Sequence, residues 1–133
     1  MAGLVDSKEN QVLDELLGNA TLMPNPVYIG LMTSAPNDDG TGVVEPAGGA
    51  YARVSVANTV PEWPAASGGQ KSNANTITFP TATGAWGTIT HFGIFDAAGG
   101  GNLLAFGALN TPRTVIASDV FRFLTAALVM TLD

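Results

Sequence analysis

Few residues in this sequence could do chemistry. The chain has a single histidine, His91, and no cysteine, so a thiolate nucleophile and thiolate metal ligands are excluded. His91 lies inside a run rich in aromatic and β-branched residues, and the nearest carboxylate in the sequence is Asp96. No Gly-x-Ser-x-Gly segment marks a serine nucleophile. We therefore interpret His91 as a hydrogen-bonded structural residue and predict that the chain has no catalytic residue.

Two further segments resemble ligand-binding loops but lack the pattern that would define one. The segment Asn37-Asp38-Asp39-Gly40 gathers oxygen ligands, yet it lacks the alternating spacing and the distal glutamate of an EF-hand loop. The three glycines at 99–101 are followed by neither a helix nor a Gly-Lys-Ser/Thr sequence, so the context of a phosphate-binding loop is missing. Both segments are typical of turns. We predict no metal site and no cofactor.

The composition favours a folded domain that contacts another protein. The chain has 133 residues, of which 46% are hydrophobic and 12% are charged, against about 25% charged in a typical globular protein. We expect a single domain over residues 1–133, which is long enough to bury a core. A surface so poor in charge indicates that part of it faces a protein partner.

Charge and hydropathy argue against two other classes of partner. Five basic residues are scattered through a chain of net charge −6, so no basic stripe can neutralise phosphates, and we predict no nucleic-acid partner. No segment approaches the ~20 apolar residues that span a bilayer, so we predict no membrane partner. The first residues lack the pattern of a signal peptide. The absence of cysteine is compatible with folding in a reducing cytoplasm.

Among the secondary-structure elements, we predict one helix, over residues 6–17. Its apolar residues recur at helical spacing and form one stripe: Val12, Leu13, Leu16 and Leu17. Asp6 and Glu9 have the spacing of a capping box, and Gly18 is a suitable C-terminal stop. A helix of about three turns is marginal alone. It must therefore dock, either on its own sheet or on a neighbouring subunit.

The stretch 85–109 predicts a β-hairpin at the centre of the fold. Its first half is rich in aromatic and β-branched residues, and its second half is apolar on both faces, as in a strand buried on two sides. The glycines at 99–101 turn the chain between them. Strict alternation would place Trp86 and Phe92 on one face and Ile89 on the other, together with His91.

Shorter strands are predicted on both sides of this hairpin. They cover residues 27–33, 51–57, 75–79, 111–116, 120–123 and 126–132, with two long loops at 34–49 and 58–74. Pro112 makes its segment an edge strand, because proline cannot donate to a ladder. About seven short strands with glycine-rich turns predict a mainly β fold: an antiparallel, jelly-roll-like β-sandwich with one short N-terminal α-helix.

Several blocks of the sequence, in this order, resemble a known family. The blocks follow the N-terminal helix and cover residues 27–36, 48–54, 77–83, 86–92, 96–98 with 101–104, and 128–133. This series resembles a family of small structural proteins of tailed phages that are usually labelled phage tail fibre proteins. The resemblance extends over nearly the whole chain. It implies a virion protein, assembled in the host bacterial cytoplasm, and supplies no catalytic residues.

Within such a family we expect a non-enzymatic accessory protein on the virion exterior. A fibre needs a long shaft, whereas this chain is spent on one compact domain. Capsid cement or decoration is therefore the favoured role, with a tail fibre or baseplate position as the alternative. The expected partner is the major capsid protein or a tail or baseplate protein of the same virion. We also expect a homo-oligomer, with a trimer favoured.

Five residues are predicted to make the contacts. Val12 and Leu16 lie on the helix stripe, while Tyr51, Arg53 and Trp63 lie beside or within the long loops. Aromatic and arginine residues dominate interface energetics, so we expect the latter three to be anchors. A lid over one end of the core is the alternative for Trp63. Because exposed loop aromatics can also stack on sugars, a carbohydrate-binding module for host attachment is a further alternative function.

Overall fold

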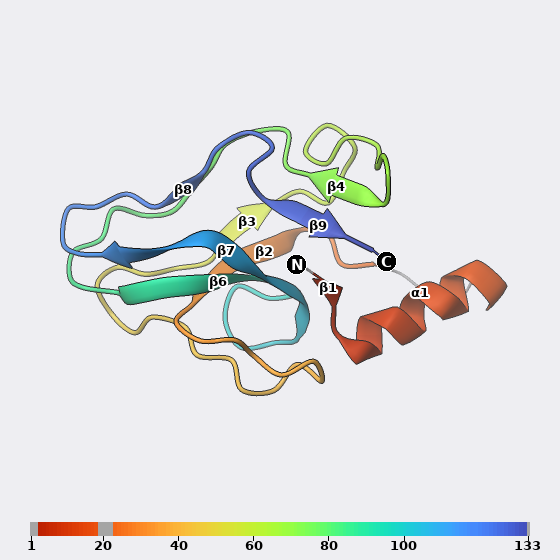
Figure 1. Ribbon diagram of the computed structural model, residues 1–133, viewed down its shortest axis with the longest axis horizontal. Helices are drawn as coiled ribbons and strands as arrows, with labels where there is room; N and C mark the ends of the chain where they lie inside the picture. The colour runs from red at the N-terminus through yellow and green to blue at the C-terminus, as the bar shows by residue number, and fades with distance from the viewer. Residues whose placement is uncertain (1–2, 19–22, 133) are drawn as a thin grey trace.

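The computed structural model describes residues 3–18 and 23–132, and within them the fold is mainly β. One helix, α1 (Asp6–Gly18), accompanies nine strands in this part of the chain (Figure 1). The strands are β1 (Gly3–Leu4), β2 (Val27–Met32), β3 (Val54–Val56), β4 (Gln70–Ser72), β5 (Ile77–Thr78), β6 (Gly87–Phe95), β7 (Leu103–Val115), β8 (Arg122–Phe123) and β9 (Val129–Thr131). The predicted mainly β fold with one N-terminal helix is confirmed.

Five strands form the main antiparallel sheet, in the order β1-β7-β6-β2-β3. The predicted hairpin is at its centre, because β6 pairs with β7 on one side and with β2 on the other. In the second pairing, Tyr28 lies opposite Phe95 and Leu31 lies opposite Phe92. Strands flanked on both edges and covered on both faces are apolar throughout. This explains why the segment that forms β2 shows no polar face.

A bulge interrupts the alternation along β6. Ile89 pairs with Arg113 and His91 pairs with Ala108, so Thr90 alone stands opposite residues 109–112 of β7. The insertion reverses which face the side chains occupy. Alternation is also broken on the other side of Ile89, at Gly87, whose φ is +82°. Trp86, Ile89 and Phe92 all join one core cluster, so the prediction that Ile89 lies on the opposite face from the other two is wrong.

β7 is one continuous strand where the sequence predicts two. Residues 111–115 belong to β7, which runs from Leu103 to Val115 without a break. Pro112 falls inside the bulge, among the residues that have no partner in the register, where its missing N–H costs no ladder bond. The prediction of a separate edge strand at 111–116 is therefore wrong, because Pro112 marks an irregularity within β7.

Two short ribbons face the main sheet and complete the second layer. β4 pairs with β9, and β5 pairs with β8, so that segments far apart in the sequence lie side by side (Figure 1). The segment 58–74, predicted as a loop, thus contains a strand. The polar residues of β4 have little strand propensity of their own, and it is the pairing with β9 that makes them extended.

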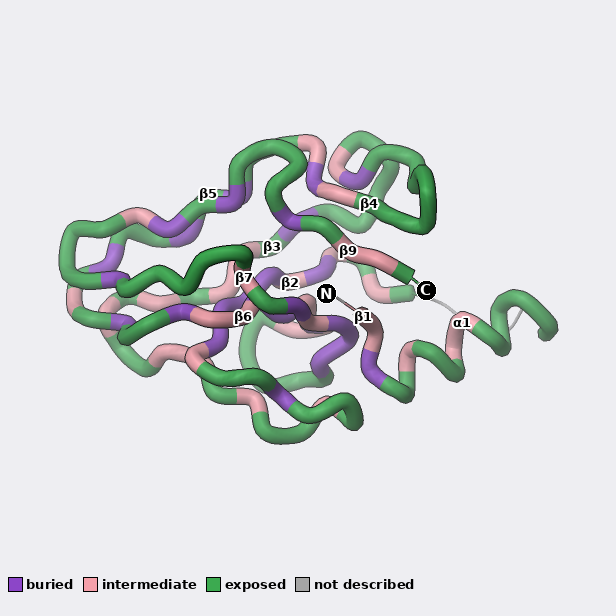
Figure 2. The backbone as a smooth tube through the Cα atoms, in the orientation of Figure 1, coloured by how far each residue is buried: buried purple, intermediate pink, exposed green. Residues whose placement is uncertain are grey.

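The core lies between these two layers. Phe79, Phe121 and Phe123 of the second layer meet edge to face, with ring centroids 5.2–6.2 Å apart. Phe123 also meets Phe92 of the main sheet at 5.8 Å, so aromatic rings join the layers. Figure 2 shows the buried residues concentrated inside the two-layer body, while the outer turns are largely exposed and α1 is exposed or intermediate.

The other face of the main sheet is covered by part of the loop between β2 and β3. Gly30 and Gly93 are paired across β2 and β6. A Cβ atom on Gly30 would lie 2.8 Å from the Phe95 ring and 2.9 Å from Glu45. Without side chains at these two positions, the loop and the Phe95 ring can approach the backbone. A small apolar cluster of Val5, Phe95 and Leu103 forms there.

The two candidate ligand loops are turns. The carboxylate of Asp39 accepts hydrogen bonds from the backbone N–H and the hydroxyl of Thr41, at 2.9 and 2.6 Å. In the β6–β7 hairpin, Asp96 accepts from the backbone N–H of Asn102 at 2.7 Å. Local bonds of this kind occupy the carboxylate oxygens that a cation would otherwise use.

Candidate functional site

Helix α1 begins where the chain leaves the main sheet. Val5 is 1% exposed, and its N–H donates to the carbonyl of Leu104 at 3.0 Å. The Val5 carbonyl accepts from Lys8 and Glu9 at 2.8 and 3.1 Å, which makes Val5 the N-cap residue. The predicted capping box of Asp6 and Glu9 is therefore wrong, because Asp6 is not the N-cap residue and Val5 has no side-chain acceptor. Asp6 and Glu9 lie in the first turn, where carboxylates interact favourably with the helix dipole.

The apolar stripe of α1 is exposed. Leu13, Leu16 and Leu17 are 54%, 74% and 83% exposed, and no residue of the helix is buried. Figure 1 shows the helix extending away from the two layers. Of the two alternatives for docking, contact with its own sheet is limited: α1 approaches β7, and the N–H of Asp6 donates to the carbonyl of Asp38 at 3.1 Å, but the leucines of the stripe stay exposed. The leucines of the stripe, among them the predicted contact residue Leu16, are therefore open to a second molecule, whereas the other predicted contact residue of the helix, Val12, is half-buried.

Tyr51 and Arg53 lie together, but their polar groups are used inside the fold. Both bind Glu45: the Tyr51 hydroxyl donates to Oε1 at 2.6 Å, and the Arg53 guanidinium donates to both carboxylate oxygens at 2.9 and 2.7 Å. Arg53 also donates to the carbonyls of Ala97 and Gly100, and lies 3.6 Å over the Phe95 ring. The Arg53 side chain is only 5% exposed. This network fastens two loops to the main sheet.

The same network shifts two pKa values. Burial alone would raise the pKa of Glu45, but the hydrogen bonds from Arg53 and Tyr51 and the charge of Arg53 outweigh it and hold that pKa below its ordinary value. Burial, together with the Glu45 carboxylate, raises the pKa of Tyr51 above its ordinary value. The carboxylate is therefore ionised and the phenol neutral at neutral pH, which is the state that this network requires.

Trp63 is a core residue. It is 7% exposed and packs in the main core cluster, and its indole N–H donates to the carbonyl of Ala57 at 3.1 Å. Of the two alternatives for Trp63, the structure matches the lid over the core and not the exposed anchor. The Tyr51 ring likewise packs edge-on against Trp86, at 5.3 Å. The carbohydrate-binding alternative thus loses the exposed aromatic pair on which it rested.

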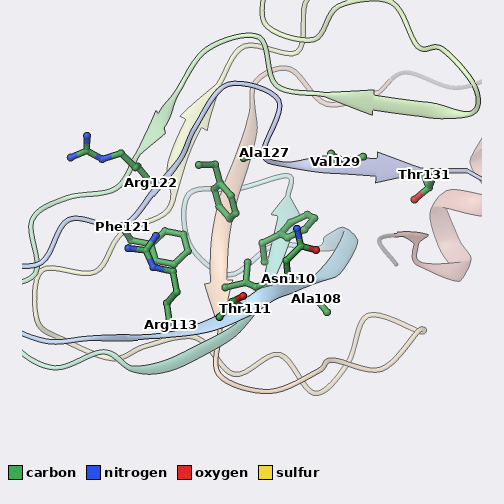
Figure 3. A pocket seen from close by; sticks show the side chains of 12 residues that line it. Ala108, Asn110, Thr111, Arg113, Phe121, Arg122, Ala127, Val129 and Thr131 are labelled. Carbon is green, nitrogen blue, oxygen red and sulfur yellow. The ribbon is translucent and has the colours of Figure 1, made fainter.

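A cleft of about 400 Å³ opens between the bulged part of β7 and the segment that contains β8 and β9 (Figure 3). We call it the Arg113 cleft. Its floor contains the largely buried rings of Phe92, Phe121 and Phe123, and its exposed lining includes two small residues, Ala108 and Ala127. The guanidinium of Arg113 lies 5.0 Å from the centroid of the Phe121 ring. Arg122 lines the same cleft and is exposed.

This cleft could not be predicted from the sequence. The bulge that shapes it depends on a register shift between β6 and β7, and the opposite wall comes from residues 121–131. One signal was present: two of the chain's five basic residues lie close together in sequence, at positions 113 and 122. Which arginines lack a carboxylate partner, however, depends on the three-dimensional arrangement.

His91 has a structural environment. Its Nδ1 atom is 2.8 Å from the hydroxyl of Thr90, and its partners across the sheet are Met32 and Ala108. Burial lowers the pKa of His91. No group of three or more His, Asp or Glu side chains within residues 3–18 and 23–132 is placed to hold a metal ion. In the same residues, no helix has the length and apolar character needed to cross a membrane.

Comparison with known proteins gives one family. The family described as "Podophage GP4 fiber I protein gp80" matches residues 3–131 of the chain. No curated protein that was compared matches it. The match includes the helix, both layers and the Arg113 cleft, so every surface considered above lies within it.

Proposed function

This chain belongs to the podophage GP4 fiber I protein family and is a structural component of a phage virion, and we propose that it acts there without enzymatic activity, through protein–protein contacts made by helix α1. The observation that carries this proposal is the exposed stripe of Leu13, Leu16 and Leu17. A helix of about three turns is marginally stable in water by itself. Burying the stripe against a partner would stabilise both the helix and the assembly.

The chemistry of the described residues supports a non-enzymatic role. The one histidine is bound to a neighbouring threonine, and the strongest polar cluster, around Glu45, is saturated by internal partners. A catalytic site would need a nucleophile or base beside a cleft that admits substrate. The Arg113 cleft offers cations, alanines and aromatic rings, but none of its lining residues is a carboxylate, histidine or lysine that could serve as a base.

For the position in the particle, we propose the tail fibre apparatus, with a tail or baseplate protein of the same virion as the neighbour. The family's description supports this position. The compact body without a shaft supports the rival role of capsid cement bound to the major capsid protein, the role that the sequence alone favoured. In either position we propose a homo-oligomer, with a trimer favoured, assembled in the host cytoplasm.

A density map of the intact particle tests this proposal. The expected result is density for the two-layer body on the tail, with α1 covered by a neighbouring chain. Density on the capsid lattice would move the protein to the cement role. A particle that lacks the chain, or an α1 that projects into solvent in the particle, would overturn the proposal.

A further inference from the structure

We propose that α1 of one copy docks in the Arg113 cleft of a neighbouring copy. The inference rests on the proposed function in one respect, namely that α1 makes a protein–protein contact, and it names the partner of that contact. Such a contact joins two different surfaces of the same protein, so it is head-to-tail. Three copies could close it into a ring, which is compatible with the trimer.

The positive charges of the Arg113 cleft favour an anionic partner. Among the described residues, Arg113 and Arg122 have no carboxylate partner, although the chain has more than twice as many acidic as basic residues, 11 against 5. Arg53 is neutralised by Glu45, Lys8 lies on α1 itself, and Lys71 lies on β4. Both remaining basic residues thus line one cleft.

The shape of the Arg113 cleft favours the binding of bulky apolar side chains. Ala108 and Ala127 are exposed and leave space above the phenyl rings of the floor, and Val129 adds apolar surface beside them. The volume of about 400 Å³ falls in the ~300–1,000 Å³ range of pockets that enclose a small ligand. The cleft can therefore receive a few side chains of a helix that lies across it, but not a whole helix.

One face of α1 supplies both features. Residues three and four positions apart lie on the same side of a helix, so Glu9, Leu13 and Leu16 form one row. At ~1.5 Å per residue, the Glu9 carboxylate stands roughly 10 Å along the axis from Leu16. Glu9 is exposed, as are the two leucines. The row of one carboxylate and two leucines on α1 is therefore complementary to the Arg113 cleft, where an arginine lies beside small apolar residues.

The helix must come from another copy, because α1 extends away from its own body (Figure 1). Its charge disfavours an anionic lipid surface: the helix contains Asp6, Glu9, Asp14 and Glu15 against Lys8, a formal charge of −3. The rest of an acidic chain also repels it. The Arg113 cleft is where the described surface combines unpaired arginines with space for leucine side chains.

Cysteine cross-linking tests the contact directly, since the chain has no cysteine of its own. Two single variants, Leu16→Cys and Ala127→Cys, are mixed and oxidised, and the disulfide-linked product is identified by mass spectrometry. We expect a Leu16–Ala127 cross-linked dimer that exceeds, by about tenfold, the product of Leu16→Cys mixed with Ala98→Cys, a control at an exposed hairpin turn. Equal yields from the two mixtures would overturn the inference.

A charge exchange provides the second test. In sedimentation velocity, Arg113→Glu should weaken self-association by about tenfold or more, whereas Lys71→Glu, with the same change in net charge, should not. Combining Arg113→Glu with Glu9→Arg should restore association. A protein that is monomeric throughout, or one in which Leu16→Ser abolishes association while Arg113→Glu has no effect, would contradict the cleft contact. The presence of the protein in particles would still support the proposed function.

Discussion

Glu45 is the residue on which the β2–β3 loop depends. Its carboxylate receives Tyr51 and Arg53, and Arg53 in turn reaches the carbonyls of the β6–β7 hairpin. Arg53 lies over the Phe95 ring, whereas the Tyr51 ring packs against the main core cluster, beside Trp86. The sequence could not predict that a loop nearer the N-terminus supplies the carboxylate for both, because glutamate in a polar loop carries no signal of its partner.

Replacing Arg53 should be costly. In Arg53→Ala, the partly buried Glu45 carboxylate and two carbonyls lose their donor, and we expect the free energy of unfolding to fall by about 2–4 kcal/mol. Arg53→Lys should be intermediate, because an ammonium keeps the charge but cannot reproduce the forked hydrogen bonds. Urea unfolding measures both. Stability equal to wild type in Arg53→Ala would contradict the role given to this network.

The low pKa of Glu45 predicts how acid affects stability. The folded state holds this pKa below the ordinary value of 4.5, so the unfolded chain takes up the proton first as the pH falls. The stabilisation is present above about pH 4.5 and is lost as the pH falls through the folded pKa. We expect the stability of Glu45→Gln to depend less steeply on pH in this window. Parallel curves for wild type and variant would contradict the assignment.

At the scale of elements, the central hairpin could be predicted and its detail could not. Aromatic and β-branched residues indicate the strands, and the glycine cluster indicates the turn. The bulge at Thr90 carries no such signal, because it follows from how two strands meet. The ribbons β4–β9 and β5–β8 could not be predicted for the same reason: two or three residues per strand give too little periodicity, and their partners lie 44 or more positions away.

The two paired glycines of the main sheet should tolerate no side chain. In Gly93→Ala, the added Cβ atom would lie 2.8 Å from the Phe95 ring and 2.9 Å from Leu103, so we expect a loss of about 1–3 kcal/mol. Gly99→Ala is the matched control, since its Cβ would meet nothing within 4 Å. Thermal unfolding of the two variants gives the comparison. A loss no larger in Gly93→Ala than in Gly99→Ala would be inconsistent with this packing.

At the scale of the whole molecule, the body and the helix have different tasks. The two layers bury seven of the ten aromatic residues, including Trp63, and so form a stable support. α1 contributes no buried residue, and the leucines of its apolar stripe are left exposed. The sequence predicts this helix and its stripe almost to the residue. Whether the stripe faces inward or outward depends on tertiary structure, which periodicity alone does not contain.

The central claim is that α1 holds this protein in the virion, and incorporation of Leu16→Ser tests it most directly. Leu16 is 74% exposed, so the variant should fold with a change of less than about 0.5 kcal/mol. Asp14→Ser, two residues away and on nearly the opposite side of the helix, is the control. With equal expression, we predict that purified particles contain much less Leu16→Ser than wild type or Asp14→Ser. Equal amounts of all three proteins in the particles would contradict the claim.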